Sequence, residues 1–305
     1  MIPDYQSLML PLLRIVSDGQ EHRYRDIIEI LATKFQIRDD ERKELLASGN
    51  QAIFDNRVGW AKTYLKKAEL LDSPKRATFI ITQVGLDTLK KNPERIDAKY
   101  LRQFPAFIEF QNASRNSNGT EEETIIISVS KETPEENLDK AYQQIRKSLA
   151  SELLQKIINL SPIFFERLVV ELLVKMGYGG SIKDAGKAIG KSGDEGIDGT
   201  IKEDKLGLDI IYIQAKRWKP GNVVGRPELH KFVGALAGQG AKKGVFITTS
   251  NFTKEALEYT PKNETKIVLI DGEQLAQLMI DYNLGCTTQQ TYELKKIDSD
   301  YFGEE

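Results

Sequence analysis

Apolar residues recur at intervals of three and four along much of the N-terminal third of the chain, the spacing of one face of a helix. One such stretch, YQSLMLPLLRIVSD, stops at Asp18 and Gly19, as a helix does at its C-terminal end. The pattern predicts four helices, a short strand and a last helix, at 5–18, 24–37, 39–50, 52–71, 78–82 and 83–93. Helices followed by a basic helix and a short hairpin indicate a winged helix-turn-helix, so we expect one over residues 1–100.

The composition changes after this unit. The stretch QNASRNSNGTEEETIIISVSKETPEE is rich in Asn, Ser, Thr and Glu, which is typical of a linker. Within it, TIIISVS is a small β-prone segment that could form a strand or an apolar patch that docks elsewhere. We therefore expect a linker over residues 101–135.

Periodic segments return in the last part of the chain, which we assign to a second domain over residues 136–305. A long helix is expected at 136–160, and the next begins with Ser161 as N-cap and Pro162 at its first position. Three strands joined by Gly-rich turns are expected within 186–218. Helices and strands then alternate, at 225–239, 242–250, 253–260, 265–271 and 272–283. This order of elements predicts a mixed β-sheet flanked by helices. With the N-terminal unit included, the whole chain is expected to be a multidomain protein of the α+β and α/β classes.

The composition limits the kinds of metal site, disulfide and membrane segment that the chain can form. The chain has 305 residues, one cysteine, two histidines and a net charge of −2. A disulfide framework within the chain and a zinc cluster of Cys and His are excluded, so a bound metal would need oxygen ligands. The apolar runs are too short for a membrane span, and no basic segment precedes the first apolar residues as in a secretory signal. We expect a cytoplasmic protein without a membrane partner.

Positive charge gathers in one segment, residues 56–79, although the chain as a whole is slightly acidic. That segment holds six basic residues against Glu69 and Asp72. A run of charge is usually a solvated face, but this one falls on the basic helix and beside the short hairpin. We expect DNA contacts, mostly to phosphates, from Arg57, Lys62, Lys66, Lys75 and Arg76.

A second candidate site lies in the stretch DIIYIQAKRW. Gln214 and Lys216 are two residues apart in an apolar strand, so their side chains share one face. Asp198 precedes Gln214 by sixteen residues, which is enough for one hairpin return. The carboxylate of Asp198, the amide oxygen of Gln214 and the carbonyl of Ala215 could then bind a divalent cation, with Mg²⁺ favoured over Mn²⁺. Lys216 could orient a water or stabilise charge on a phosphate, as phosphodiester hydrolysis requires.

These motifs together resemble the Mrr-type branch of the PD-(D/E)xK nuclease superfamily. GIDG followed by IYIQAK is similar to its D…QxK motif, in which Gln replaces the usual second acid. FERLVVELLVKMGYGG resembles the leading helix of that family, and its acid corresponds to Glu166. VGRPELHKFVGALAGQGAKKGVFITTSNFT resembles the block after the lysine, and NRVGWAKTYLKKAELL resembles the DNA-binding winged helix. The resemblance covers most of the chain apart from the linker.

The resemblance implies a restriction-endonuclease-like core and metal-dependent cleavage of methylated double-stranded DNA. It implies catalytic roles for Asp198, Gln214, Lys216 and Glu166. Because a double-strand break needs two cuts, we expect a homo-oligomer, a dimer or a tetramer, associated with the nucleoid when bound to DNA.

Other interpretations stay open. Asp198 alone could be a turn acid, Lys216 alone a strand-end charge, and Glu166 a solvated carboxylate. Asp194 and Glu195 are expected to be turn acids. A DNA-binding regulator whose nuclease-like domain senses or oligomerises without cutting is the main alternative, and Gln214 in place of an acid is the feature that supports it. A nuclease acting in repair or on RNA is a third.

Overall fold

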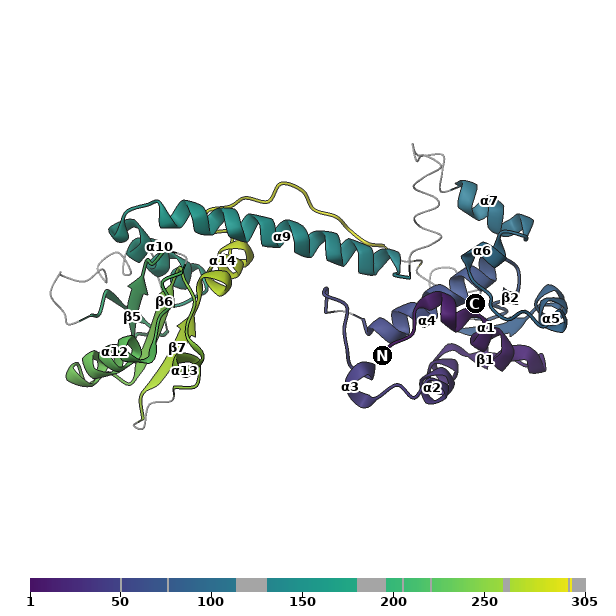
Figure 1. The fold of residues 1–305 in the computed structure, drawn as a ribbon, viewed down its shortest axis with the longest axis horizontal. Coiled ribbons are helices and arrows are strands. Elements are labelled where there is room, and N and C mark those ends of the chain that lie inside the picture. Colours follow the sequence, from purple (N-terminus) through teal and green to yellow (C-terminus); the bar gives the residue numbers. More distant parts are fainter. Residues whose placement is uncertain are drawn as a thin grey trace. The chain divides into compact units, whose positions relative to one another are not determined.

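A computed structural model describes most of the chain, and its contacts divide the chain into two units. The first unit comprises residues 1–142 with 295–305, and the second comprises residues 143–294. The described residues are 1–49, 51–75, 77–113, 131–179, 196–204, 206–219, 221–259, 264–295 and 297. Figure 1 shows the elements of both units, coloured from purple at the N-terminus to yellow at the C-terminus. Each unit is described by itself.

The first unit is mainly helical, with a small sheet. Its helices are α1 (Tyr5–Ile15), the 3₁₀ turn η1 (Val16–Asp18), α2 (Tyr24–Lys34), α3 (Asp39–Arg42), α4 (Ile53–Lys67), α5 (Gln83–Lys90), α6 (Ala98–Leu101) and α7 (Pro105–Ala113). Its strands are β1 (His22–Arg23), β2 (Leu71–Asp72) and β3 (Thr78–Ile81). The strands form an antiparallel sheet in the order β1-β3-β2.

Capping and apolar packing explain the principal helices of this unit. The Asp4 carboxylate accepts the main-chain N–H groups of Gln6 and Ser7 at 3.0 Å, which starts α1. The apolar faces of α1 and α4 pack together in one core, in which Leu8, Leu12 and Phe54 are fully buried. Burial of these faces stabilises helices that would be marginal in isolation.

Two segments of the first unit differ from the sequence expectation. The helix expected at 39–50 is only α3, four residues long. Residues 105–113, expected within the linker, form α7, and Phe107 is fully buried in the first core. The aromatic residues of PAFIEF explain the difference, because they bury apolar area that a solvated linker would expose. The expected β-prone segment TIIISVS lies outside the described residues.

The second unit contains a four-stranded sheet with helices around it. Its helices are α9 (Pro134–Ile158), which begins in the first unit, α10 (Pro162–Lys175), α12 (Arg226–Gly238), α13 (Lys254–Leu257) and α14 (Gly272–Asp281). Its strands are β4 (Gly199–Lys202), β5 (Ile210–Lys216), β6 (Lys243–Thr248) and β7 (Lys266–Ile270). The order is β4-β5-β6-β7, with β4 antiparallel to β5 and the other pairs parallel. The predicted mixed sheet flanked by helices is confirmed.

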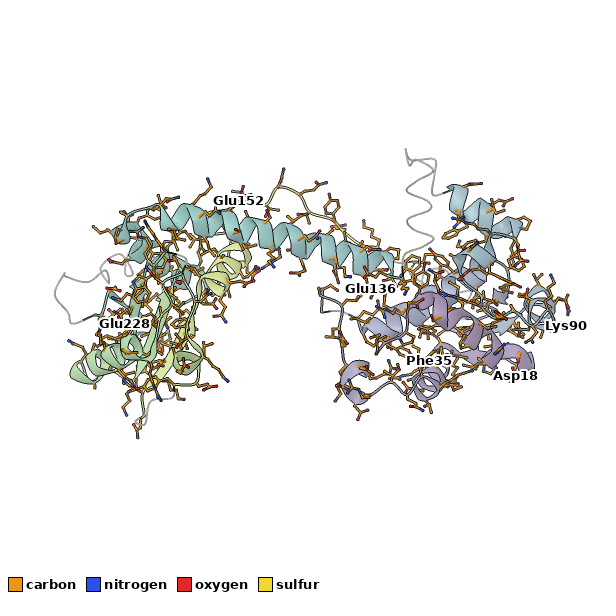
Figure 2. The ribbon with its side chains drawn as sticks, in the orientation of Figure 1. Asp18, Phe35, Lys90, Glu136, Glu152 and Glu228 are labelled. Carbon is orange, nitrogen blue, oxygen red and sulfur yellow. The ribbon has the colours of Figure 1, made fainter. Side chains whose placement is uncertain are left out.

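The sheet of the second unit is covered on both faces. Ile213 and Ile247 point into a core formed with α10 and α14, whereas Phe246 points into a second core with α12. Strand residues alternate between the faces, so neighbouring positions enter different cores. Figure 2 draws the side chains on these elements and labels Glu152 on α9 and Glu228 on α12. No helix in the described part of the chain is long and apolar enough to cross a membrane.

Candidate active site

The hairpin of β4 and β5 brings Asp198 to the end of β5. Gly199 lies opposite Ile213 in the register of these strands. The N–H of Asp198 also donates to the carbonyl of Ile213, at 2.9 Å. Two consecutive residues therefore face one residue of the partner strand, which is the arrangement of a β-bulge. A bulge re-aims the side chain that it carries, and here it turns the Asp198 carboxylate toward β5.

The Asp198 carboxylate contacts the main chain between the two polar residues of β5. Its Oδ2 accepts the N–H of Ala215 at 2.7 Å. The N–H and C=O of one strand residue leave the strand on the same side, toward the same neighbour. The carbonyl of Ala215 therefore faces the side from which Asp198 approaches. A carboxylate oxygen and a carbonyl oxygen are thus brought to one place at the open end of the hairpin.

Gln214 lies beneath this point and is only 4% exposed. A β-carbon placed on Gly196 would come 3.2 Å from its side-chain Nε2, and Gly196 has a φ of +102°. The turn before Asp198 thus passes close over the Gln214 amide, in a conformation that favours glycine. Gly196 therefore limits how closely the turn can approach Gln214.

Glu166 and Lys216 complete the arrangement from different faces of the sheet. Glu166 comes from α10, and Lys216 shares a face of β5 with Gln214. Burial raises the pKa of Glu166, the negative charge of Asp198 raises this pKa further, and the ammonium of Lys216 opposes both effects. Burial also raises the pKa of Asp198, against the lowering effects of the Ala215 N–H and Lys216. The charges of these residues therefore interact around the end of β5.

The donor set fits a hard divalent cation with few charged ligands. Within the described residues, no three side chains of His, Cys, Asp or Glu come together as a metal cluster. The oxygens available are the carboxylate of Asp198, the carbonyl of Ala215 and the amide of Gln214. Oxygen-only ligands suit Mg²⁺ or Mn²⁺, and water or a phosphate would have to supply the remaining positions.

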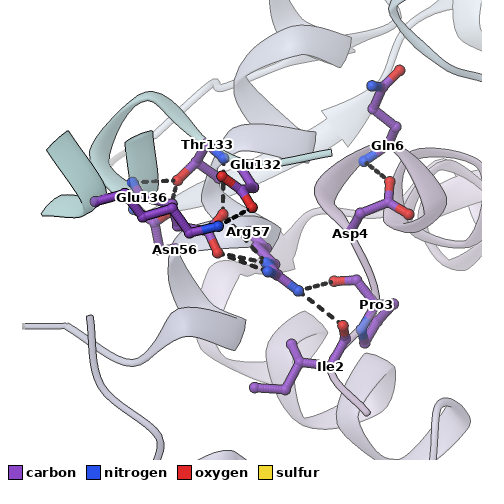
Figure 3. Close-up of polar contacts among 10 residues, drawn as sticks. Ile2, Pro3, Asp4, Gln6, Asn56, Arg57, Glu132, Thr133 and Glu136 are labelled. Atoms are coloured by element: carbon purple, nitrogen blue, oxygen red, sulfur yellow. Dashed lines mark hydrogen bonds and ion pairs between the residues drawn. The ribbon is translucent and has the colours of Figure 1, made fainter. Parts of the chain in front are cut away.

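Arg57, expected to contact DNA, points into the first unit instead of outward (Figure 3). Its Nη2 donates to Glu136 Oε1 at 2.7 Å, and its Nη1 donates to the carbonyls of Ile2 at 2.8 Å and Pro3 at 3.2 Å. The side chains of Arg57 and Glu136 are only 17% and 9% exposed. The guanidinium is engaged by a carboxylate and by the N-terminal main chain, so it does not present a free charge to solvent.

The other residues expected to contact DNA differ in their exposure and in their partners. Lys62 lies over the ring of Tyr24, with Nζ 4.7 Å from its centroid, and burial lowers the pKa of Lys62 with a smaller effect from Lys66. Lys66 is exposed on α4. Lys75 is exposed and pairs with Glu21 at 3.1 Å. Arg76 lies outside the described residues, as do the expected turn acids Asp194 and Glu195.

Sequence reasoning gave no role to several residues that organise these two regions. Asn56 accepts a hydrogen bond from the Thr133 hydroxyl at 2.6 Å, beside Arg57 and Glu136. In the second unit, Arg217 donates to the carbonyl of Ile158 and so ties the end of β5 to the end of α9. A sequence signal existed for Thr133 alone: TPEE places Thr and Glu at capping-box spacing with Pro between them.

Comparisons with known proteins give consistent matches. A family model described as "Restriction endonuclease" matches residues 157–279, and one described as "Mrr N-terminal domain" matches residues 5–91. The chain is 37% identical over 311 residues to the "Type IV methyl-directed restriction enzyme EcoKMrr" of Escherichia coli (strain K12), and the match covers 99% of each chain.

Two solved structures also match 45% of the chain, each with a TM-score of 0.35. One is the MspJI restriction endonuclease in complex with a 27-mer oligonucleotide, at 23% identity over 33% of that chain. The other is the DNA modification-dependent restriction endonuclease AspBHI, at 16% identity over 35% of that chain.

Proposed function

Because the chain belongs to the Mrr family of restriction endonucleases, we propose that it cleaves methylated double-stranded DNA by hydrolysing phosphodiester bonds. The observation that supports the proposal is the contact of the Asp198 carboxylate with the Ala215 N–H at 2.7 Å, next to Lys216 in β5. A metal-dependent endonuclease needs such a convergence of oxygen ligands and positive charge.

In the proposed mechanism, Asp198, the Ala215 carbonyl and the Gln214 amide oxygen hold a divalent cation. That cation, Mg²⁺ or Mn²⁺, would neutralise the scissile phosphate and lower the pKa of the attacking water. Lys216 stabilises the charge that develops on the phosphate oxygens. Glu166, whose pKa is raised by burial and by the charge of Asp198, is suited to accept a proton from a water molecule.

The first unit is proposed to be a winged-helix domain that binds DNA. The element order α1, β1, α2, α3, α4, β2, β3 and the small antiparallel sheet support this proposal. Lys62, Lys66, Lys75 and Arg76 would contact phosphates. Arg57 is assigned to holding the start of α9, since its donors are already engaged.

Cleavage of both strands calls for two active sites, so we propose a homo-oligomer, a dimer or a tetramer. Each copy would contribute one set of Asp198, Gln214 and Lys216 to one strand. The protein would work in the cytoplasm and associate with the nucleoid through its DNA contacts.

A DNA-binding regulator that does not cut is the alternative. It is supported by Gln214, because an amide in place of an acid removes one negative charge that would attract the cation. A regulator would bind DNA tightly in any divalent cation without breaking a phosphodiester bond.

Cleavage of two matched plasmids separates these functions. Wild-type protein is incubated with the same supercoiled plasmid in methylated and unmethylated form, with Mg²⁺ and with Mn²⁺. We expect nicked and linear product from the methylated plasmid, and at least about 1,000-fold slower cutting by Lys216→Ala. Lys219→Ala, an exposed lysine on the following segment, is the control and should cut normally. Equal cutting by wild type and Lys216→Ala would contradict the site, and binding without cutting would favour the regulator.

A further inference from the structure

Three consecutive hydroxyl side chains at the end of β6 hold the segment that follows β5. Thr248 Oγ1 donates to the carbonyl of Lys216 at 2.9 Å, and Thr249 Oγ1 donates to the carbonyl of Trp218 at 2.7 Å. Ser250 Oγ donates to the carbonyl of Asn222. All three side chains are buried. A buried hydroxyl and a buried carbonyl both lose free energy if left unpaired, so these bonds fix the segment.

The carbonyl of Lys216 accepts three hydrogen bonds. Besides the Thr248 hydroxyl, it accepts the N–H of Thr249 at 3.2 Å and the N–H of Trp218 at 3.1 Å. The last of these bonds spans two residues and closes a tight turn at Arg217. Thr248 Oγ1 in turn accepts the N–H of Ser250 at 3.1 Å, which sets the direction in which the hydroxyl donates.

The main chain of Thr249 and Ser250 is in contact with the start of α14. The N–H of Gly272, the first residue of α14, donates to the carbonyl of Ser250 at 2.8 Å. A β-carbon on Gly272 would lie only 2.6 Å from the carbonyl oxygen of Thr249. The main chain of α14 therefore packs directly against this segment and limits its movement. Displacement of Thr248 or Thr249 away from β5 would require displacement of α14.

The position of these bonds relative to β5 gives them a consequence for the candidate site. Regular pairing of β4 with β5 stops at Gly199 opposite Ile213, whereas pairing of β5 with β6 continues to Lys216 opposite Thr248. Residues 214–216 therefore have a regular strand neighbour on one side only, the side of β6. Whatever fixes β5 to β6 at this end also fixes the Ala215 carbonyl and the base of the Lys216 side chain.

We propose that Thr248 and Thr249 are positioning residues of the nuclease site, which hold the main chain at Lys216–Trp218 so that Lys216 and the Ala215 carbonyl face Asp198. The proposal rests on the function proposed above. Neither hydroxyl touches a reacting atom, so both act through the residues of β5. Residues that orient ligands in this indirect way commonly change metal affinity or activity by about 10–100-fold.

Paired substitutions separate positioning from general stability. Thr248→Val keeps the shape of the side chain and removes the hydroxyl, whereas Thr248→Ser keeps the hydroxyl and removes a methyl group. The same pair at Thr249 serves if a Thr248 variant fails to fold. Thr253→Val is the matched control, because its hydroxyl caps α13 in the same unit by accepting the N–H of Ala256 at 3.2 Å.

The first measurement is Mn²⁺ binding to the full-length protein without DNA, followed by electron paramagnetic resonance. The signal lost in Asp198→Ala defines the site. The second measurement is the single-turnover cleavage rate of methylated plasmid under saturating protein. We expect Thr248→Val to weaken Mn²⁺ binding and slow cleavage by about 10–100-fold, with DNA affinity unchanged. Thr248→Ser should recover most of both, and Thr253→Val should change neither.

The possible results distinguish failure of the positioning role of Thr248 and Thr249 from failure of the proposed nuclease function. Wild-type Mn²⁺ affinity and cleavage rate in both valine variants would overturn the positioning role. If wild-type protein binds Mn²⁺ at Asp198 but cuts no methylated DNA, the proposed function fails while the Mn²⁺ comparison still decides the role of the threonines. If wild-type protein neither binds Mn²⁺ at Asp198 nor cuts, both proposals are overturned.

Discussion

Two regions of the molecule bring acidic and basic side chains together, and they do so in opposite ways. In the first unit, every nitrogen of the Arg57 guanidinium has an acceptor, and Glu136 also accepts the N–H of Thr133 at 2.8 Å. In the second unit, partial burial raises the pKa values of Glu166 and Asp198, and the ammonium of Lys216 offsets this effect only in part. No ion pair of Lys216 is found within the described part of the chain.

The difference distinguishes a structural cluster from a site prepared for chemistry. A buried pair with all its hydrogen bonds satisfied holds two segments together and has little left to offer a ligand. Partly desolvated carboxylates are unfavourable for the protein alone, and in the proposed function they would become favourable when a cation and a phosphate bind. Variants in one of these regions can therefore be compared with matched variants in the other.

The largest effect is expected from breaking the Arg57 pair. Arg57→Met leaves the Glu136 carboxylate buried without its cation, which should cost about 3–5 kcal/mol of unfolding free energy. Lys216→Met should cost far less, because among the described residues Lys216 forms no ion pair and only its longer-range attraction to Glu166 and Asp198 is lost. Urea unfolding of both variants measures the contrast. The double variant Arg57→Met with Glu136→Met should recover much of the loss, and a wild-type stability of Arg57→Met alone would contradict the structural role.

The pH dependence of cleavage follows from the raised pKa values of Asp198 and Glu166. Both carboxyls act in their charged form, so a raised pKa moves the loss of activity to higher pH. The cleavage rate should rise more steeply than tenfold per pH unit where both carboxyls are still protonated, and should level off above a pKa higher than the ordinary carboxyl value of about 4. The measurement is a single-turnover rate profile at a fixed cation concentration below saturation, because a bound cation would displace the proton from Asp198. A rate that is already level at pH 4 would contradict the burial of these groups.

Removing the charge of Asp198 should stabilise the second unit. Because its folded pKa is raised, the ionised carboxylate reduces stability as pH rises from the unfolded pKa through the folded pKa, and the penalty persists at neutral pH. Asp198→Asn keeps an acceptor for the Ala215 N–H and should raise Tm at neutral pH.

The control for this gain is Asp209→Asn. The pKa of Asp209 is lowered by its hydrogen bond with Lys243, so removing that charge should not raise Tm. Thermal unfolding at neutral pH and at pH 4 provides the test, because the gain should shrink at the lower pH. A lower Tm for Asp198→Asn at neutral pH would show that its carboxylate stabilises the fold.

The smallest effects are expected on DNA binding. Lys66→Gln removes an exposed charge on α4 and should weaken binding about threefold at moderate salt, reducing the slope of log K against log salt by about 1. Arg57→Met, measured where it is folded, should leave the slope unchanged. Lys90→Gln on α5 (Figure 2) is the control, since Lys90 pairs with Asp87 at 2.7 Å. An unchanged slope of log K against log salt for Lys66→Gln would contradict a contact of Lys66 with DNA.

Local signals predicted much of the second unit. The apolar run ending in Gln214 and Lys216 predicted β5, and the sixteen residues back to Asp198 predicted the hairpin that places them side by side. Periodicity and the Ser161-Pro162 cap predicted α10, which carries Glu166. These features depend on spacing within a short stretch, which the sequence displays directly.

Features that depend on distant partners could not be predicted in this way. The ion pair of Arg57 and Glu136 joins residues 79 positions apart, so Arg57 looked like part of a basic surface. The bulge at Asp198 depends on which carbonyl its N–H meets. The burial of Phe107 depends on the first core, which an isolated segment does not reveal.

Asp198 is proposed to hold a catalytic cation, and the cation dependence of cutting tests this role. Nicking of methylated plasmid is followed across a Mn²⁺ titration for wild type and Asp198→Ala at equal DNA occupancy. The account predicts a saturable rise for wild type and no cation-dependent cutting by Asp198→Ala at any concentration. The same titration curve for both proteins would contradict it.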